Sequence, residues 1–483
     1  MPPLYSAEWF AHNLVFMTHL FSPRFTAYGL MAIAVAVYAN SFLGAFQFDD
    51  FATILHNPHL DSGEVFFAHL DHMVRPALYF TFLIDRLLYA DVAFGYHVIN
   101  IGLHLVSGWL VYRILLRAPS HENTFLACWT ATLFLVHPLA TETVTYLSGR
   151  ASGMMSCFYL LAFLLYLKGT EEGSGGHPRV WYIGSLLAFL VALASKETAV
   201  TFPLAILLWD VVVRHVRGAS LRSTFLSYHV PFWGIVLALG LALVIHPQYG
   251  YLARFSLDIR PLWHNVLSQI HAVVYAIVLF FAPWKQSFDH DLPLYHSLFE
   301  WPLVVDLTVL IGLMVAALLS VRRFPLAVFG MGWFFLQLLP TNSVIPRNDL
   351  LSERNLYLPS VGLLLAVVTG VLAVVRINGD IPLRQWMQTG IRCVALMGVM
   401  ALCVLTVQRN ALYQDPVLLW SDTVHKSPHK ARPHNNLGHS YAVQGDWGHA
   451  IEEFRFALTL NPDYPLAQQN LRDAYLFQAG RSD

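Results

Sequence analysis

The chain begins its first long apolar run at Phe25 and closes it with two adjacent carboxylates, in the stretch FTAYGLMAIAVAVYANSFLGAFQFDD from Phe25 to Asp50. About 20 consecutive apolar residues are enough to cross a bilayer, so this run is predicted to be a membrane span. Asp49 and Asp50 stand at its mouth. Two neighbouring charges are costly to bury there but tolerable in a wet vestibule, where they can bind a polar substrate or take a proton from it.

The composition is that of a membrane protein. Of the 483 residues, 56% are hydrophobic and 12% are charged, and the mean hydropathy is +0.52. A soluble domain carries about twice that share of charge. The net charge of -1 gives no basis for nucleic-acid binding. The first twenty residues contain Glu8 and lack a basic start followed by a clean apolar core, so we expect a signal-anchor rather than a cleaved signal peptide.

Apolar runs continue to about residue 409 and predict an all-α, polytopic membrane domain over residues 1–409. The runs lie near 25–46, 93–116, 124–143, 151–167, 180–194, 198–213, 224–245, 264–283, 303–321, 324–339, 359–375 and 390–407. Basic residues fall on alternate connections, at Arg113, Arg117, Lys168, Arg179, Arg214, Arg217, Arg222, Arg322, Arg323, Arg376 and Arg384.

The positive-inside rule places these basic connections in the cytoplasm. All of them stay there only if the run 264–283 is a re-entrant or interfacial helix at the outer face. We therefore predict about eleven spans, with the N-terminus inside and the C-terminus outside. The alternative is that every apolar run spans the membrane and that the charge of one connection is a weak indicator of its side.

Residues 410–483 are soluble in character and repeat with a period of 34 residues, since Leu437 recurs as Leu471 and Tyr441 as Tyr475. Leucine, glycine and aromatic residues stand at the positions that define tetratricopeptide repeats. The pattern predicts a repeat domain with one full repeat, 431–464, between two half repeats. So short an array is expected either to bind a protein partner or to cover the face of the membrane domain.

The predicted outer loops hold most of the polar residues. These loops are 47–92, 144–150, 195–197, 246–302 and 340–358, and they are rich in His, Asp, Arg and Asn. A transporter more often places its polar groups at the membrane midplane, on broken helices of paired repeats. Polar groups gathered at one mouth are more typical of an active site at the membrane surface.

The first outer loop supplies the main catalytic candidates. One carboxylate of Asp49 and Asp50 is predicted to be a general base for an acceptor hydroxyl, while the other orients the hydroxyl or holds a metal. Arg75 precedes the helix that begins at Pro76 and offers a fork of donors suited to a lipid phosphate. The alternatives are a solvated span end for the carboxylates and an interfacial, snorkelling arginine.

Two further loops carry candidate residues. The turn HPLATETVTYLSGR contains His137, Glu142 and Arg150, and Arg150 is a second candidate for phosphate binding with Glu142 as its ion-pair partner. Lys196 and Glu197 follow the fifth apolar run, in LASKET. Opposite charges in so apolar a context are costly unless paired, so this pair is either a structural ion pair or part of the site.

The loop PRNDLLSERNLYLPS is the most densely charged outer loop and contains Arg347, Glu353 and Arg354. Two arginines near the lipid headgroups would neutralise a phosphate leaving group; a plain surface network is the alternative. The segment Asp289–Asp291, with His290 between two carboxylates, makes Mg²⁺ or Mn²⁺ a candidate cofactor. Because the sequence shows no partner set at metal-ligand spacing, the metal ligands stay unknown.

Several phrases occur together in one order: FDD, RPALYF, YHVINIGLHL, LFLVHPLATETVTYLSGRASGM, LASKETAVTFP and SERNLYLPSVG. As a set they resemble the transmembrane and tetratricopeptide-repeat (TMTC) protein O-mannosyltransferases and their bacterial relatives, of the GT-C superfamily. The resemblance implies an inverting transfer of a sugar from a polyprenyl phosphate to a protein hydroxyl. It further implies that Asp49, with Asp50 beside it, is the base, that Arg75 contacts the lipid phosphate, and that Arg347 and Arg354 add contacts from the last outer loop.

The resemblance also implies partners and a location. These are a polyprenyl-phosphate-linked sugar donor, the membrane lipid, and an exported or periplasmic protein acceptor. Eukaryotic members carry long repeat arrays, so one full repeat favours a bacterial inner-membrane enzyme acting on a pilin or another exported protein, with an ER enzyme as the eukaryotic alternative. Its site and repeats are expected on the periplasmic or lumenal side. A non-catalytic scaffold and a flippase of lipid-linked sugars are the other classes considered.

Overall fold

The computed structural model describes residues 23–120, 122–171, 177–214, 221–245, 247–377 and 385–479. The expectation about the first twenty residues lies outside these ranges. The described residues form helices and no strand. In the membrane domain the helices are α2 Pro23–Tyr38, α3 Gly63–Ala68, α4 Pro76–Tyr89, α5 Ala93–Leu115, α6 Asn123–Val136, α7 Thr141–Val144, α8 Arg150–Thr170, α9 Pro178–Ser195, α10 Phe202–Trp209, α11 Leu221–Thr224, α12 Val230–Ile245, α13 Pro247–Ile259, α14 Leu262–Phe281, α15 Trp301–Ser320, α16 Pro325–Leu338, α17 Tyr357–Ile377 and α18 Gln385–Leu412.

Among the described residues, 7 helices are long and apolar enough to cross a membrane, or 8 if α6 and the bent segment after it count as one span. The predicted all-α polytopic membrane fold is confirmed. The number of full-length spans is smaller than the predicted eleven, because several apolar runs form shorter helices: Gly29–Leu43, Pro325–Leu338 and Tyr357–Ala373. The run 198–213 is divided between a 3-10 turn, the eight-residue α10 and a π-helical turn.

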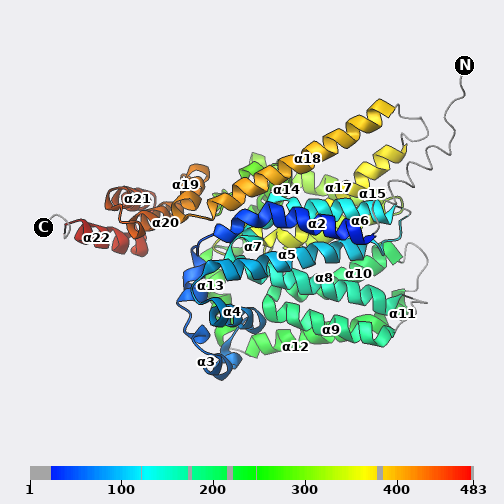
Figure 1. Cartoon of the computed structure of the whole chain (residues 1–483), viewed down its shortest axis with the longest axis horizontal. Coiled ribbons are helices and arrows are strands. Elements are labelled where there is room, and N and C mark those ends of the chain that lie inside the picture. The colour runs from blue at the N-terminus through cyan, green and yellow to red at the C-terminus, as the bar shows by residue number, and fades with distance from the viewer. Residues whose placement is uncertain are drawn as a thin grey trace, which may run out of the picture.

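Helix α8 lies at the centre of the bundle, between α5 and α9 (Figure 1). Of its most apolar window 78% is buried, against 11% for α15, whose side chains therefore face outward. Helices α16 and α17 pack closely where Gly330 meets Gly362, and a Cβ on either glycine would run into the backbone carbonyl of the other. Such close approach of small residues is a common way to lock membrane helices together.

Helix α14 has the length of a span, but its contacts lie at one end of the bundle. Near its start, Asn265 donates to the Ser343 carbonyl (2.9 Å) in the loop between α16 and α17. At its end, the Phe280 carbonyl accepts from His137 (3.1 Å), which follows α6. The segments after α6 and α16 are themselves in contact, so both ends of α14 lie at the same end of the bundle. This arrangement agrees with the predicted interfacial helix.

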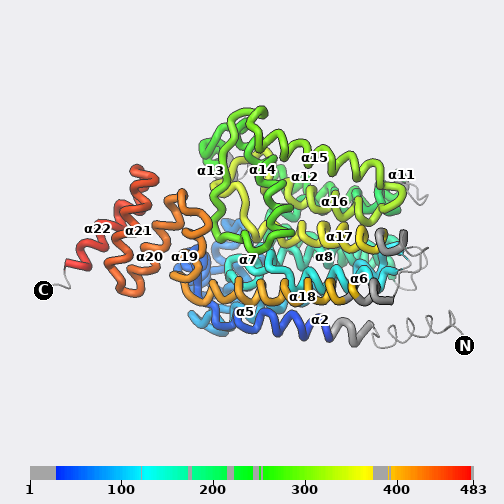
Figure 2. The backbone as a smooth tube through the Cα atoms, turned by 90° about the horizontal axis from the view of Figure 1, so that it is seen from above, coloured from blue at the N-terminus to red at the C-terminus, as the bar shows by residue number. Residues whose placement is uncertain are grey.

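The C-terminal residues form helices that pack in sequence order, each against the next: α19 Pro416–Lys426, α20 Ala431–Val443, α21 Trp447–Leu460 and α22 Pro465–Ala479. Gly438 of α20 lets the Phe454 ring of α21 approach closely, since a Cβ there would lie 2.8 Å from the ring. This tail projects from the end of the bundle where α18 finishes (Figures 1 and 2). Its assignment as a tetratricopeptide domain stays a prediction.

Candidate active site

The two aspartates of the first loop face different surroundings. Asp50 is fully buried; one of its oxygens accepts the N–H (2.7 Å) and the hydroxyl (2.5 Å) of Ser148, and the other accepts the Gln47 N–H (2.9 Å). Burial raises the pKa of Asp50 to about 7, even though these hydrogen bonds oppose the rise. Asp50 therefore fastens the first loop to the turn before α8.

Asp49 points the other way, and 39% of its side chain is exposed. The backbone turns just before it, because Phe48 adopts a positive φ of 40°, a conformation that costs energy in residues other than glycine. The Asp49 N–H donates to the Tyr146 hydroxyl (3.0 Å). The structure thus separates the pair into a buried anchor and a half-exposed carboxylate.

Arg354 lies between Asp49 and Glu142. Its Nη1 is 3.5 Å from Asp49 Oδ2, and its Nε is 3.7 Å from Glu142 Oε1. Its backbone N–H also donates to Glu142 (3.0 Å), and its guanidinium stands over the Tyr146 ring. Burial alone would lower the pKa of Arg354, but the neighbouring carboxylates hold that pKa above its ordinary value. Arg354 is therefore a permanent cation beside Asp49.

A second charged group is centred on Glu197. Arg75 binds it with both arms of its guanidinium, Nε to Oε2 at 3.0 Å and Nη2 to Oε1 at 2.8 Å. Arg347 approaches the same carboxylate at 3.8 Å. Burial would raise the pKa of Glu197, but the Arg75 guanidinium, together with Lys196 and a backbone hydrogen bond, outweighs burial and lowers that pKa to about 2. All three side chains are between 29% and 38% exposed, so the arginines remain accessible to an anion.

Lys196 connects these two groups. Its ammonium is buried and donates to Ser152 (2.7 Å) and Asn355 (2.8 Å). It lines, together with Arg354, a small pocket of about 10 Å³, roughly the space that one water needs. Burial and the nearby Arg75 and Arg354 charges lower the pKa of Lys196 well below its ordinary value. An anion placed here would relieve that repulsion.

Arg150 lies elsewhere, and its predicted pairing with Glu142 is wrong. It is fully buried and forms an ion pair with Asp85 of α4 at 2.5 Å. Its other donors bind Asn100 Oδ1 (2.7 Å) and the Tyr96 carbonyl (2.9 Å). Because its donors are occupied inside the bundle, Arg150 holds α4, α5 and α8 together and is not placed to contact a phosphate at the surface.

His137 and Glu353, two other candidates from the sequence, also make contacts that hold the fold together. His137 is buried, is stacked on Phe280 and accepts the Leu139 N–H (3.2 Å). Glu353 is fully buried and turns away from Asp49, toward His290 (3.0 Å) and the Ser287 N–H (2.7 Å). Both shape the loops around the site without facing it.

Sequence reasoning missed Tyr146, Ser148 and Asn355, which position Asp49, Asp50 and Lys196 respectively. Each stands within a quoted phrase, TETVTYLSGR or SERNLYLPS. The sequence signal that could have identified these residues is a polar side chain among apolar neighbours at the mouth of the bundle.

The residues near the site do not fit a divalent cation. Among the described residues no group of three or more His, Cys, Asp or Glu side chains is placed to hold a metal. Asp49 and Glu142 both face Arg354. In the segment 289–291, Asp289 binds Lys430 and Arg432, and His290 binds Glu353. Arginine and lysine thus occupy the positions that a cation would need.

Comparison with known proteins confirms the resemblance noted from the sequence. The chain is 24% identical over 465 residues to a protein O-mannosyl-transferase of Caenorhabditis elegans, covering 90% of this chain and 62% of that protein. It is 27% identical over 495 residues to human protein O-mannosyl-transferase TMTC4, covering 88% of this chain and 64% of the human protein. The chain thus spans less than two thirds of these relatives. No protein-family model matches.

Among solved structures, that of ArnT from Cupriavidus metallidurans bound to undecaprenyl phosphate is similar. The alignment covers 92% of this chain and 77% of the ArnT chain. The sequence identity is 14% and the TM-score is 0.41.

Proposed function

We propose that this chain is a membrane glycosyltransferase that moves a sugar from a polyprenyl phosphate to Ser or Thr hydroxyls of an exported protein, with inversion. The observation that carries the proposal is the pairing of half-exposed Asp49 with Arg354 at the end of the bundle where Arg75, Arg347 and Lys196 also gather. The homology to protein O-mannosyl-transferases supports the same reaction class.

In this proposal Asp49 is the general base. An acceptor hydroxyl within about 3 Å gives its proton to the carboxylate as its oxygen attacks C1 of the sugar. The bond from C1 to the phosphate oxygen breaks, and the lipid phosphate leaves with the electron pair. Asp50 is unsuited to the role, because it is fully buried and both its oxygens accept hydrogen bonds from the protein.

The cations stabilise the leaving phosphate. The guanidinium groups of Arg75, Arg347 and Arg354 lie beside Glu197 and Asp49 and are permanent cations. The negative charge that develops on the leaving phosphate would meet these fixed positive charges, which favours the transition state over the ground state. An arginine fork is well matched to phosphate oxygens.

The proposed location follows from the contacts of the tail. Lys430 and Arg432 of the tail contact Asp349, in the loop that carries Arg347 and Arg354, so tail and site lie at the same end of the bundle. The basic connections of the sequence support a location of that end outside the cytoplasm, in the periplasm or the lumen.

The test is the intact mass of exported proteins, pilins included, from cells that carry wild type, Asp49→Asn or Asp71→Asn. Asp71 is a matched control because it lies in the same loop and is 75% exposed. We expect a hexose-sized increment with wild type and Asp71→Asn and its loss with Asp49→Asn at equal membrane expression. An increment that persists in Asp49→Asn rules out Asp49 as the base, and no increment in any strain favours a non-catalytic scaffold.

A further inference from the structure

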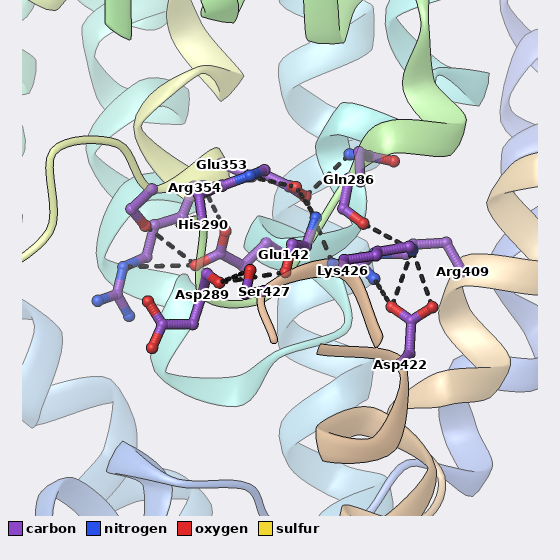
Figure 3. A network of polar contacts seen from close by, with 12 residues as sticks. Glu142, Gln286, Asp289, His290, Glu353, Arg354, Arg409, Asp422, Lys426 and Ser427 are labelled. Atoms are coloured by element: carbon purple, nitrogen blue, oxygen red, sulfur yellow. Dashed lines mark hydrogen bonds and ion pairs between the residues drawn. The ribbon is translucent and has the colours of Figure 1, made fainter. Parts of the chain in front are cut away.

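The junction between the tail and the membrane domain consists of buried and half-buried charges. We call it the tail junction; it comprises Asp289, Asp349, Glu353, Arg409, Asp422, Lys426, Lys430 and Arg432. Figure 3 shows a large part of it, with Asp289 and His290 toward the left and Arg409, Asp422 and Lys426 toward the right. The carboxylates Asp289, Asp349 and Glu353 belong to loops of the membrane domain.

Asp289 depends on the tail for its neutralisation. Its side chain is 1% exposed, and it binds Lys430 and the Arg432 Nε (2.6 Å). Arg432 also donates to Asp349 Oδ1 at 2.5 Å. One guanidinium at the start of α20 therefore bridges the α14–α15 loop and the α16–α17 loop. A buried carboxylate that loses such a partner becomes strongly unfavourable.

Glu353 is also bound by residues at the tail junction. Its oxygens accept from Ser287 N–H (2.7 Å) and Gln286 (3.0 Å), and Arg409 at the end of α18 lies 3.6 Å away. Arg409 in turn binds Asp422 of α19 at 3.0 Å. Lys426 of α19 completes the connection by donating to the Gln286 carbonyl (2.7 Å).

The loop held in this way is the one that carries the site arginines. Arg354 directly follows Glu353 and faces Glu142 and Asp49, so adjacent side chains point to the junction and to the site. Arg347 stands two residues before Asp349 and faces Glu197. Within this loop the tail contacts Asp349, two residues after Arg347, and the end of α18 contacts Glu353, next to Arg354.

We infer that the first tail hairpin, α19–α20, is a positioning element of the active site, and that Arg432 is its main positioning residue. Through Asp349 and Asp289 it fixes the α16–α17 loop so that Arg354 and Arg347 face Asp49 and Glu197. What these arginines bind rests on the proposed function, whereas the mechanical coupling does not. A module that only recruits partners needs no more than a linker and a small, polar interface.

The experiment compares the full-length protein with Arg432→Gln, Arg432→Lys and the control Arg455→Gln, whose side chain is exposed on α21. Amide hydrogen exchange of residues 347–356 measures the coupling without any assay of activity. We expect Arg432→Gln to speed exchange there about tenfold or more, since a hydrogen bond to a charged group contributes about 1.5–3 kcal/mol. Arg432→Lys keeps the charge but loses the guanidinium fork, so its exchange rate should lie between those of wild type and Arg432→Gln. Arg455→Gln should exchange at the wild-type rate.

Transfer kinetics supply the second measurement. Arg432→Gln should lower kcat about tenfold with a smaller change in the KM for the lipid donor, because misplaced arginines lose more in the transition state than in the ground state. If Arg432→Gln does not fold, Arg432→Lys carries the test alone. Unchanged exchange of residues 347–356 in both Arg432 variants overturns the inference. A wild type without transfer activity overturns the proposed function instead, while the exchange result still decides the coupling.

Discussion

Ser148 gives both its backbone N–H and its hydroxyl to one oxygen of Asp50, at 2.7 and 2.5 Å. The other Asp50 oxygen accepts the Gln47 N–H. This carboxylate is therefore the fastening between the first loop and the turn that leads into α8. Its neighbour Asp49 is free to face Arg354 because Asp50 holds the loop.

The buried Asp50 predicts a stability that depends on pH. Its pKa is raised from 3.8 to about 7 by burial, so between these values the folded protein binds a proton that the unfolded chain has released. The stability it contributes is full below about pH 4 and is lost as the pH rises through about 7. We expect wild type to lose about 2–3 kcal/mol more between pH 5 and 8 than Asp50→Asn. Thermal unfolding in detergent at both pH values checks this; parallel curves for the two proteins would contradict it.

Asp49→Asn should abolish most transfer without loss of stability. Removing a general base lowers the rate by about 10²- to 10⁴-fold, and Asp49 is half exposed, so its loss leaves no buried group unpaired. The measurement is turnover with a purified polyprenyl-phosphate sugar and an acceptor peptide, beside a thermal unfolding curve. A matching drop in unfolding temperature would instead identify Asp49 as a structural residue.

Arg354→Ala should lower turnover by about 10²- to 10³-fold, as removal of a charge-stabilising donor commonly does. Its charge opposes the phosphate charge that grows in the transition state, so kcat should fall more than donor affinity. Steady-state kinetics with varied donor separate the two effects. Unchanged product formation would remove Arg354 from the mechanism.

Arg150→Ala should destabilise the bundle by about 3–5 kcal/mol, because it leaves Asp85 buried without its partner. The companion double variant Arg150→Met with Asp85→Leu should recover much of that stability and retain transfer activity. Unfolding midpoints and turnover of both variants provide the comparison. A stable double variant with lost donor binding would restore Arg150 as a phosphate ligand.

Much of the architecture could be predicted because hydrophobic runs and their lengths determine it. The candidate residues Asp49, Arg75, Arg347 and Arg354 were also found from the sequence, since charges at the mouth of a membrane bundle are costly and thus conspicuous. Their arrangement into two groups, around Arg354 and Glu197, could not be predicted, because it depends on contacts between loops far apart in the chain.

The errors share one physical cause. Arg150 and Glu142 are close in sequence and of opposite charge, which suggested an ion pair. The fold instead brings Asp85 of α4 to Arg150 and Arg354 to Glu142. Likewise, two adjacent aspartates looked equivalent until the turn at Phe48 directed one inward and one outward. Side-chain direction in irregular segments is decided by tertiary packing.

The contact between Gly330 and Gly362 has a consequence for motion at the site. These glycines hold α16 and α17 close together beside the loop that bears Arg347 and Arg354. The two ends of this loop are therefore kept from moving apart. Its far side is held by Arg432 and Arg409. Under the proposed function, a donor arriving from the membrane meets arginines that adjust by side-chain rotation rather than by movement of the whole loop.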